Sequence, residues 1–329
     1  MLKKLVKCLC FMCLVLTVTL CVSCKGKNEK IKVGIIKYTT ATPLDAARSG
    51  IIEGLKEAGY VAGDNIEIVD FNCLQSADTM SQNVKSAIRS CDIIFAIATP
   101  VAQTLAKEMA KQGVKTPVLF TAVTDPVASG IIASDTKPGV SISGTSDMNP
   151  VAEQIALALE LNSNAKKIGF IYTTTEDNSR VQLELARTKA AELGIEIVAQ
   201  GVSSATELQT ATKSLINDGV DAIYLPTDNN VSENAGVVIN EANLNGIPTI
   251  CGESTFLDKG GTITLGIDYT ELGKLTGKMG ADVLAGKVKI EELAVGRLTN
   301  FELIINVTAA TSSNITISEE LKSKANEIR

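Results

Sequence analysis

The sequence predicts an α/β protein made of two doubly wound lobes, each built around a parallel sheet. Residues 92–106 place a short apolar run before a Thr-Pro turn and an amphipathic segment, which is typical of a buried parallel strand that leads into a helix. Residues 221–241 repeat this layout. The length of 329 residues exceeds the size at which one core usually keeps growing. Together these observations favour two lobes over one.

The repeat extends along both halves of the chain. Residues 32–40 and 167–175 are similar first strands, and each is followed by a helical pattern that ends in Gly. The later elements also occur in pairs, one in each copy. They are strands at 66–68 and 195–197, helices at 79–89 and 207–218, the strand-helix segments 92–106 and 221–241, and strands at 113–120 and 246–251. A unit of about 130 residues is the size of a domain, so we interpret the chain as two copies of one lobe.

The N-terminus predicts export. Three lysines precede the apolar residues 8–22, a combination typical of a secretory signal and too short for a comfortable membrane span. The following Ser23-Cys24 resembles the bacterial lipobox, although Cys21 stands where Leu is commonest. We therefore expect a lipoprotein signal peptide at residues 1–23, lipidation of Cys24 and a hydrated tether at residues 24–30. A plain signal peptide cut nearby is the alternative.

Cysteine usage fits an exported protein without a disulfide framework. Five of the eight cysteines lie in or at the edge of the signal, and the body keeps Cys73, Cys91 and Cys251. An odd number implies at least one free thiol. Cys91 and Cys251 lie in or beside apolar strands, where small buried thiols are common.

Composition excludes several classes of function. The net charge of −6 and the lack of a long basic run argue against nucleic acid as a partner. The chain has no His, which excludes Ser-His-Asp and Cys-His catalysis and the usual zinc sites. Residues 273–279 lack the spacing of a phosphate loop, and their apolar periodicity predicts a helix face with small residues for close packing. We expect no enzyme activity, no cofactor and no metal.

Polar loops follow the predicted strands in both halves, and they supply the candidate ligand-binding residues. The carboxyl ends of parallel strands share one edge of a sheet, so two facing lobes would enclose a cleft between these loops. Thr99 is expected to be the N-cap of a helix that starts at Pro100. The candidates are Tyr38, Thr39, Thr42, Thr99, Pro100, Thr124, Asp125, Thr145 and Ser146 in the first half, and Tyr172, Asn178, Thr227, Asp228, Asn229, Glu253 and Asp268 in the second.

The chemistry of these loops indicates a small zwitterionic ligand. Helix N-termini and hydroxyls suit its carboxylate, and Asp or Glu suits its ammonium. The loops hold almost no Arg or Lys, which disfavours phosphate or sulfate, and a chain with no Trp and 4% aromatic residues is less suited to sugars. If Asp228 binds the ligand, Asp228→Ala should weaken binding at least about tenfold with little change in melting temperature.

Six short stretches carry a resemblance to a known family. They are residues 44–48, 98–103, 124–127, 144–147, 226–229 and 266–273, and they resemble the substrate-binding lipoproteins of the tryptophan/tyrosine ABC transporter family. The similarity covers about residues 31–329 and adds Gln103 to the candidates. It implies a type I periplasmic binding protein, a monomer anchored on the outer face of the cell membrane, that delivers Trp, Tyr or Phe to a permease and an ATPase. Tyr38, Tyr172 and Tyr269 are then the candidates to flank the ligand ring.

The resemblance also implies three crossings between the lobes, which close on the ligand. We expect lobe 1 at residues 31–143 plus 265–295 and lobe 2 at residues 144–264 plus 297–329. The alternatives are a receptor of the same fold for a sugar, a nucleoside or another amino acid, and a ligand-sensing module without a transport role. A LacI-type regulator is disfavoured because an export signal stands where a DNA-binding helix-turn-helix would be, and an exported enzyme lacks a catalytic constellation.

Overall fold

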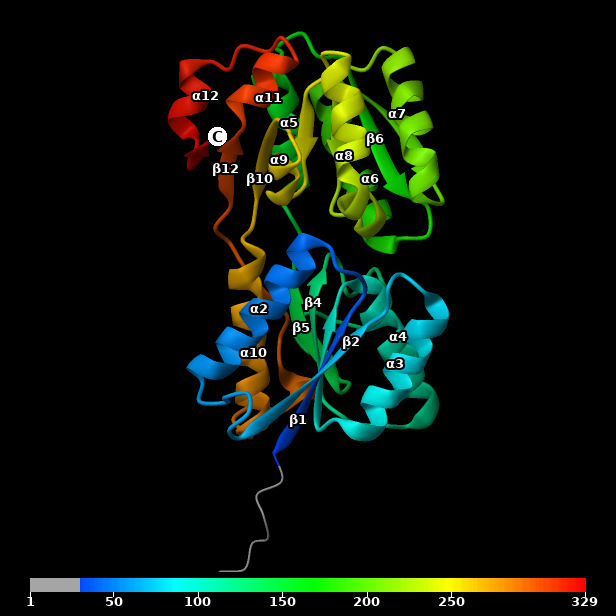
Figure 1. Ribbon diagram of the computed structural model, residues 1–329, viewed down its shortest axis with the longest axis vertical. Helices are drawn as coiled ribbons and strands as arrows, with labels where there is room; N and C mark the ends of the chain where they lie inside the picture. The colour runs from blue at the N-terminus through cyan, green and yellow to red at the C-terminus, as the bar shows by residue number, and fades with distance from the viewer. Residues whose placement is uncertain (1–29) are drawn as a thin grey trace, which may run out of the picture.

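The computed structural model describes residues 30–329, which form two lobes stacked along the long axis of the molecule (Figure 1). The first lobe contains a six-stranded sheet and the second a seven-stranded sheet. The predicted signal peptide, Cys24 and nearly all of the predicted tether lie outside the described residues.

Lobe 1 consists of a parallel sheet with helices on both faces. Its strand order is β11-β5-β4-β3-β1-β2. The elements are β1 (Ile31–Lys37), α2 (Thr42–Glu57), β2 (Ile66–Asn72), α3 (Ala77–Ser90), β3 (Ile93–Ile97), α4 (Thr99–Gln112), β4 (Val118–Val123), β5 (Ile142–Ser146), α10 (Tyr269–Leu284), η2 (Ile290–Glu292) and β11 (Gly296–Arg297). The apolar core strands β3 and β4 are buried along their whole length, as the sequence predicts for parallel strands covered on both faces.

Lobe 2 repeats this architecture. Its strand order is β13-β12-β10-β9-β8-β6-β7, with every pair parallel except β12 against β10. The elements are α5 (Val151–Leu161), β6 (Lys167–Thr173), α6 (Asp177–Leu193), β7 (Glu196–Val202), η1 (Ala205–Glu207), α7 (Leu208–Asn217), β8 (Ala222–Leu225), α8 (Asn229–Leu244), β9 (Thr249–Cys251), α9 (Thr255–Asp258), β10 (Ile263–Gly266), β12 (Glu302–Ile305), α11 (Val307–Ser312), α12 (Glu319–Lys324) and β13 (Glu327–Ile328).

The two sheets confirm the internal duplication. The order β5-β4-β3-β1-β2 in lobe 1 corresponds strand for strand to β10-β9-β8-β6-β7 in lobe 2. In each lobe the first strand lies between the second and the third, which is the arrangement of a doubly wound sheet. The carboxyl ends of both sheets therefore face the boundary between the lobes, where the predicted polar loops lie.

The chain crosses between the lobes three times and exchanges two helices. Helix α5 follows β5 of lobe 1 but packs against α6 of lobe 2, and α10 follows β10 of lobe 2 but packs against α2 of lobe 1 (Figure 1). The third crossing joins β11 to β12. Each lobe is therefore completed by a helix whose preceding strand belongs to the other lobe.

Sheet pairing shifts the expected lobe boundaries by a few residues. Residues 144–146 were assigned to lobe 2 but continue β5, which pairs with β4. Leu265 and Gly266 pair with β12 in lobe 2, and Arg297 pairs with β5 in lobe 1. In each place the pairing continues a residue or more past the expected boundary.

Helices α2 and α10 pack with backbones in direct contact, because glycines face each other. A Cβ atom at Gly273 would lie 2.1 Å from the carbonyl oxygen of Ala47, and one at Gly50 would lie 2.1 Å from that of Thr270. The prediction that residues 273–279 form a helix face for close packing is thus confirmed.

The remaining features of the described chain concern cysteines, metals and membranes. Cys73, Cys91 and Cys251 are all buried free thiols. Within residues 30–329, no group of three or more His, Cys, Asp or Glu side chains is arranged to hold a metal ion. None of the helices described here has the length and apolar character needed to span a bilayer.

Candidate ligand-binding cleft

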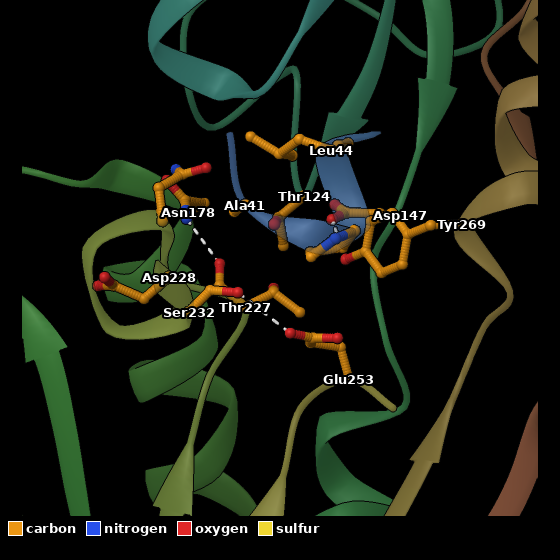
Figure 2. A pocket seen from close by; sticks show the side chains of 13 residues that line it. Ala41, Leu44, Thr124, Asp147, Asn178, Thr227, Asp228, Ser232, Glu253 and Tyr269 are labelled. Atoms are coloured by element: carbon orange, nitrogen blue, oxygen red, sulfur yellow. Dashed lines mark hydrogen bonds between the residues drawn. The ribbon is translucent and has the colours of Figure 1, made fainter. Parts of the chain in front are cut away.

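A cavity lies between the lobes at the carboxyl ends of both sheets. The cavity is narrow, because the space that its lining atoms leave for the centre of a water molecule is ≈ 20 Å³. Its walls come from lobe 1, from the first crossing and from lobe 2, as Figure 2 shows. The lining residues are Ala41, Pro43, Leu44, Ala122, Thr124, Asp147, Asn178, Thr227, Asp228, Asn229, Ser232, Glu253 and Tyr269.

Asp228 fixes the lobe 2 wall from within. Its carboxylate accepts hydrogen bonds from the Thr173 N–H (2.6 Å), the Thr173 hydroxyl (2.8 Å), the Ser179 hydroxyl (2.7 Å) and the Val231 N–H (2.9 Å). The last of these makes Asp228 the N-cap of α8. The side chain is 1% exposed, and its oxygens are engaged by the protein, so its main role is to hold the loops after β6 and β8 together.

Glu176 is a buried carboxyl beside Asp228 that the sequence analysis did not select. It accepts hydrogen bonds from the N–H groups of Asn229 (3.0 Å) and Asn230 (3.2 Å) and from the Asn229 side chain (2.6 Å). Burial, and then the nearby charge of Asp228, raise the pKa of Glu176 to about 8. Since Glu176 and Asp228 occupy the first N–H groups of α8, this helix start is not open to a ligand carboxylate, contrary to the expectation from the sequence.

Glu253 forms the end of the cavity nearest α9. Its oxygens accept hydrogen bonds from the hydroxyl of Ser232 (3.1 Å) and from the N–H of Thr255 (2.8 Å). The Thr255 hydroxyl also donates to it at 2.6 Å. Burial raises the pKa of Glu253 above its usual range. Glu253 thus brings a further desolvated acidic group to the cavity.

Asp147 and Tyr269 lie side by side where two of the crossings meet (Figure 2). The Tyr269 hydroxyl donates to Oδ2 of Asp147 at 2.7 Å, while Oδ1 of Asp147 is buried without a hydrogen-bond partner. Burial raises the pKa of Asp147. An unpaired carboxylate oxygen is costly in a buried place, so it marks a position at which a ligand donor would be stabilised.

Two more unpaired polar atoms share the cavity with Asp147. They are Oδ1 of Asn178 and Oγ1 of Thr227, both buried. The Asn178 amide nitrogen donates to the Thr227 carbonyl at 2.8 Å, which leaves the amide oxygen as the free atom. Among the lining residues that the structure describes, no Lys or Arg is present. The cavity is therefore rich in acceptors and acids and suits a ligand with a cationic donor.

The lobe 1 wall contains the start of α2, which no side chain caps. The N–H groups of Leu44 and Asp45 both donate to the Ala41 carbonyl, and Pro43 has no N–H. The N–H groups of Ala41 and Thr42 are the remaining backbone donors of this helix start. Together with the Thr124 hydroxyl, they are the groups on this wall suited to a ligand carboxylate.

Seven of the predicted residues line the cavity: Thr124, Asn178, Thr227, Asp228, Asn229 and Glu253, together with the ring-flanking candidate Tyr269. Two others join the lobes beside it. The Thr39 hydroxyl donates to Glu233 at 3.2 Å, and the Gln103 amide donates to Asp177 at 2.6 Å. Tyr38 is half-buried, and burial together with the charges of Glu176 and Asp228 raises its pKa to about 12, which places it at the same boundary.

Other predicted site residues serve the structure of one lobe. The Thr145 hydroxyl bonds to Thr276 at 2.7 Å beneath α10, and the Ser146 hydroxyl donates to the Thr124 carbonyl at 2.7 Å. Tyr172 packs its ring edge-on against Phe170, with centroids 6.2 Å apart.

Four further residues cap turns or helices or lie outside the cavity. Asp125 accepts from the N–H groups of Val127 and Ala128, and Asp268 is the exposed N-cap of α10. Thr42 is exposed through its side chain, and Pro100 lies in the first turn of α4, away from the cavity lining.

Thr99 is the first residue of α4 and not its N-cap. The N-cap is Ala98, whose φ of 86° is unusual for a residue with a side chain, and no side chain caps the helix. The Thr99 hydroxyl is buried without a partner, and the residue does not line the cavity. The junction has the predicted strand-turn-helix form, but with the cap one residue earlier.

The buried carboxyl groups of the cleft predict that the stability of the ligand-free protein depends on pH. A carboxyl group whose folded pKa is raised binds more protons in the folded state, so stability falls as pH rises from its unfolded pKa to its folded pKa. For Glu176 this interval ends at about 8. We expect the unfolding free energy to drop by at least about 1 kcal/mol between pH 6 and pH 9. Urea titrations at each pH measure it.

The Glu176→Gln variant is the matched control, because it removes the titrating group while keeping the size of the side chain. Its stability should depend less steeply on pH than that of the wild type. A stability that rises between pH 6 and pH 9 in the wild type would contradict a protonated Glu176.

The fold and the cleft define a class of protein: a two-lobed binding protein of the type I periplasmic binding protein fold. The sequence profile of the family described as ABC transporter substrate binding protein matches residues 32–329. The chain belongs to this family.

Three relatives are informative. A tyrosine-binding protein of Clostridioides difficile (strain R20291) is 38% identical over 283 residues, or 85% of this chain and 80% of the relative. The crystal structure of an ABC domain from Streptococcus pneumoniae in complex with L-Trp is 29% identical with a TM-score of 0.85, covering 92% of this chain and 100% of that one. The ligand-free, open structure of a substrate binding protein with adhesive properties from Clostridium difficile is 32% identical with a TM-score of 0.69, covering 91% and 99%.

The TM-scores bear on the arrangement of the lobes. The open structure superposes less well than the L-Trp complex although its sequence identity is slightly higher and its coverage is similar. The lobes here also contact each other through hydrogen bonds from Thr39 to Glu233 and from Gln103 to Asp177. This structure is therefore more similar to the structure in complex with L-Trp than to the ligand-free, open one, and its lobes are in direct contact.

Proposed function

We propose that the protein is a receptor that captures an aromatic amino acid, Trp, Tyr or Phe, between its lobes and presents it to an ABC permease and its ATPase. The observation that carries this proposal is the unpaired, buried oxygen of Asp147 in a cavity to which both lobes contribute. The names of the tyrosine-binding and L-Trp-bound relatives support the aromatic ligand. The proposed role is binding without chemical change.

In this proposal each part of the amino acid has its own partners. The ammonium binds at Asp147, and the carboxylate binds at the start of α2 beside Thr124. The ring lies near Tyr269, which lines the cavity, and Tyr38, which lies at the boundary. Contacts from both lobes favour the closed state, and the Gln103–Asp177 hydrogen bond forms only when the lobes approach.

We further propose that the receptor is exported and anchored by a lipid at Cys24, with residues 1–23 as signal peptide and residues 24–30 as tether. The basic and apolar pattern of the N-terminus supports this, as does the extracytoplasmic role of the family. We expect a monomer, because a receptor that closes around one ligand is complete within a single chain.

Calorimetry of the purified protein against the twenty amino acids, sugars and nucleosides tests the function. Binding of Trp, Tyr or Phe in preference to the others is the expected result. Binding confined to sugars or nucleosides would keep the receptor class and remove the aromatic amino acid. Chemical turnover of a bound ligand would contradict the class itself.

The Asp147→Asn variant should bind the preferred amino acid roughly 10- to 100-fold more weakly, since it removes the charge that faces the ammonium. Its melting temperature should stay the same or rise, because the amide still accepts from Tyr269 and no longer buries a charge. Calorimetry and thermal unfolding measure the two effects. The control is Asp64→Asn, at an exposed turn of lobe 1. Unchanged affinity in Asp147→Asn would remove this carboxylate from the site.

A further inference from the structure

The charges of the cavity are unbalanced in a way that distinguishes the two ends of an amino acid. Asp147, Asp228 and Glu253 line it, and Glu176 lies directly behind Asp228. All four carboxyls are at least 96% shielded from solvent, being 1–4% exposed. The lining residues within the described chain include no Lys or Arg. A cationic group is therefore favoured here, whereas a ligand carboxylate meets no opposite charge.

The free hydrogen-bonding atoms show the same asymmetry. Oδ1 of Asn178 can only accept, Oδ1 of Asp147 accepts when its carboxyl is ionised, and Oγ1 of Thr227 can accept as well. Asn178 cannot present its nitrogen instead, because that nitrogen already donates to the Thr227 carbonyl. A ligand ammonium brings three donors and no acceptor. The unpaired atoms of the cavity thus match the amine of the ligand and not its carboxylate.

The donors available to a carboxylate are few. Of the helix starts at the cleft, that of α8 is occupied by Glu176 and Asp228, and that of α10 is capped by Asp268, whereas no side chain caps the start of α6, where Asn178 lines the cavity. The start of α2 retains the N–H groups of Ala41 and Thr42. A carboxylate bound there gains two neutral donors and a helix dipole but also lies in a cavity lined by acids, so the favourable and unfavourable contributions largely cancel.

We propose that the cleft also binds aromatic monoamines, such as tyramine and tryptamine, which are aromatic amino acids without the carboxylate. This inference rests on the proposed function, since it takes the aromatic amino acid as the reference ligand. Loss of the carboxylate removes contacts at the start of α2 and at the same time turns a neutral zwitterion into a cation. The amine and the ring are the recognised groups, and monoamines form a second class of ligand.

The test compares three ligands that share one ring. Calorimetry of the purified protein with L-Tyr, tyramine and 3-(4-hydroxyphenyl)propionate separates the contribution of the amine from that of the carboxylate. Tyramine should bind within tenfold of L-Tyr, and the propionate, which lacks the amine, at least 100-fold more weakly than L-Tyr. Tryptamine and indole-3-propionate should behave in the same way relative to L-Trp. Tyramine and tryptamine more than tenfold weaker than their amino acids would overturn the proposal.

The outcomes separate this inference from the proposed function. If the amino acids bind and the amines do not, the inference fails and the receptor for aromatic amino acids stands. If neither binds, both fail. The Asp147→Asn variant adds a check on the contact itself, because it should weaken L-Tyr and tyramine by the same factor, while Asp64→Asn changes neither. Tyramine binding that is insensitive to Asp147→Asn would place the amine elsewhere and overturn the proposal.

Discussion

The Gly273→Ala variant should lose about 3 kcal/mol of unfolding free energy, although alanine is the better helix former by about 1 kcal/mol. The added Cβ would lie 2.1 Å from the Ala47 carbonyl oxygen, a backbone atom of α2 that cannot move aside like a flexible side chain. Relief would require α2 and α10 to separate along a contact in which Gly50 also has no room for a side chain. Urea denaturation of the two proteins measures the difference.

The same substitution at Gly236 is the matched control. This glycine lies within α8, and a Cβ added there meets no atom within 4 Å. Gly236→Ala should therefore gain roughly 0.5 to 1 kcal/mol from helix propensity alone. Opposite signs for one substitution at two helical glycines would isolate the effect of the close approach. A gain in stability at both positions would show that α2 and α10 can separate at little cost.

The Asp228→Ala variant should lose at least about 3 kcal/mol of stability in addition to its ligand affinity. The substitution removes the N-cap of α8 and leaves the donors of Thr173 and Ser179 buried without partners. Relief of the repulsion between Asp228 and Glu176 offsets part of this loss. The structure therefore reverses the expectation from the sequence, which was a loss of affinity with little change in melting temperature.

Asp268→Ala provides the comparison, since Asp268 is also a helix N-cap but is exposed and accepts only from the N–H groups of Thr270 and Glu271. Its loss should be about 1 kcal/mol. Denaturation curves for the two variants then compare the loss of an exposed helix cap, Asp268, with the loss of a buried acceptor that joins two loops, Asp228. A melting temperature of Asp228→Ala within a degree of the wild type would favour the original interpretation of Asp228 as a ligand contact.

The fold could be predicted from the sequence because it is repeated. Residues 92–98 and 221–225 each read as a buried strand before a helix, and they became β3 and β8 at equivalent positions of the two sheets. A pattern that occurs twice in the same order is far less open to chance than either copy alone. The boundaries were less accurate, since Thr145 and Ser146 are polar and give no sign that β5 continues through them.

The site could be predicted as a set of loops but not as a set of side chains. Loops 144–147 and 266–269 were both predicted, and Tyr269 lines the cavity as one of the ring-flanking candidates, yet the first loop contributes Asp147 rather than Thr145, and Asp268 caps α10. Asp147 lies just beyond the end of β5 and Asp268 is the N-cap of α10, so a role in the site changes from one residue to the next where a strand ends or a helix begins. Glu176 was not predicted because its role is to accept hydrogen bonds from the first N–H groups of α8, and only the tertiary structure brings these groups to it.

The exchange of α5 and α10 has a consequence for synthesis on the ribosome. The nascent chain completes strands β1 to β5 early, but the groove along α2 into which Gly273 fits stays uncovered until residues 269–284 have been made. The second half of the polypeptide must therefore emerge before the first can finish its core, which delays cooperative folding and prolongs the exposure of apolar surface. No uninterrupted segment of the gene encodes either lobe, so an isolated lobe could be produced only by splicing separate pieces with an artificial linker.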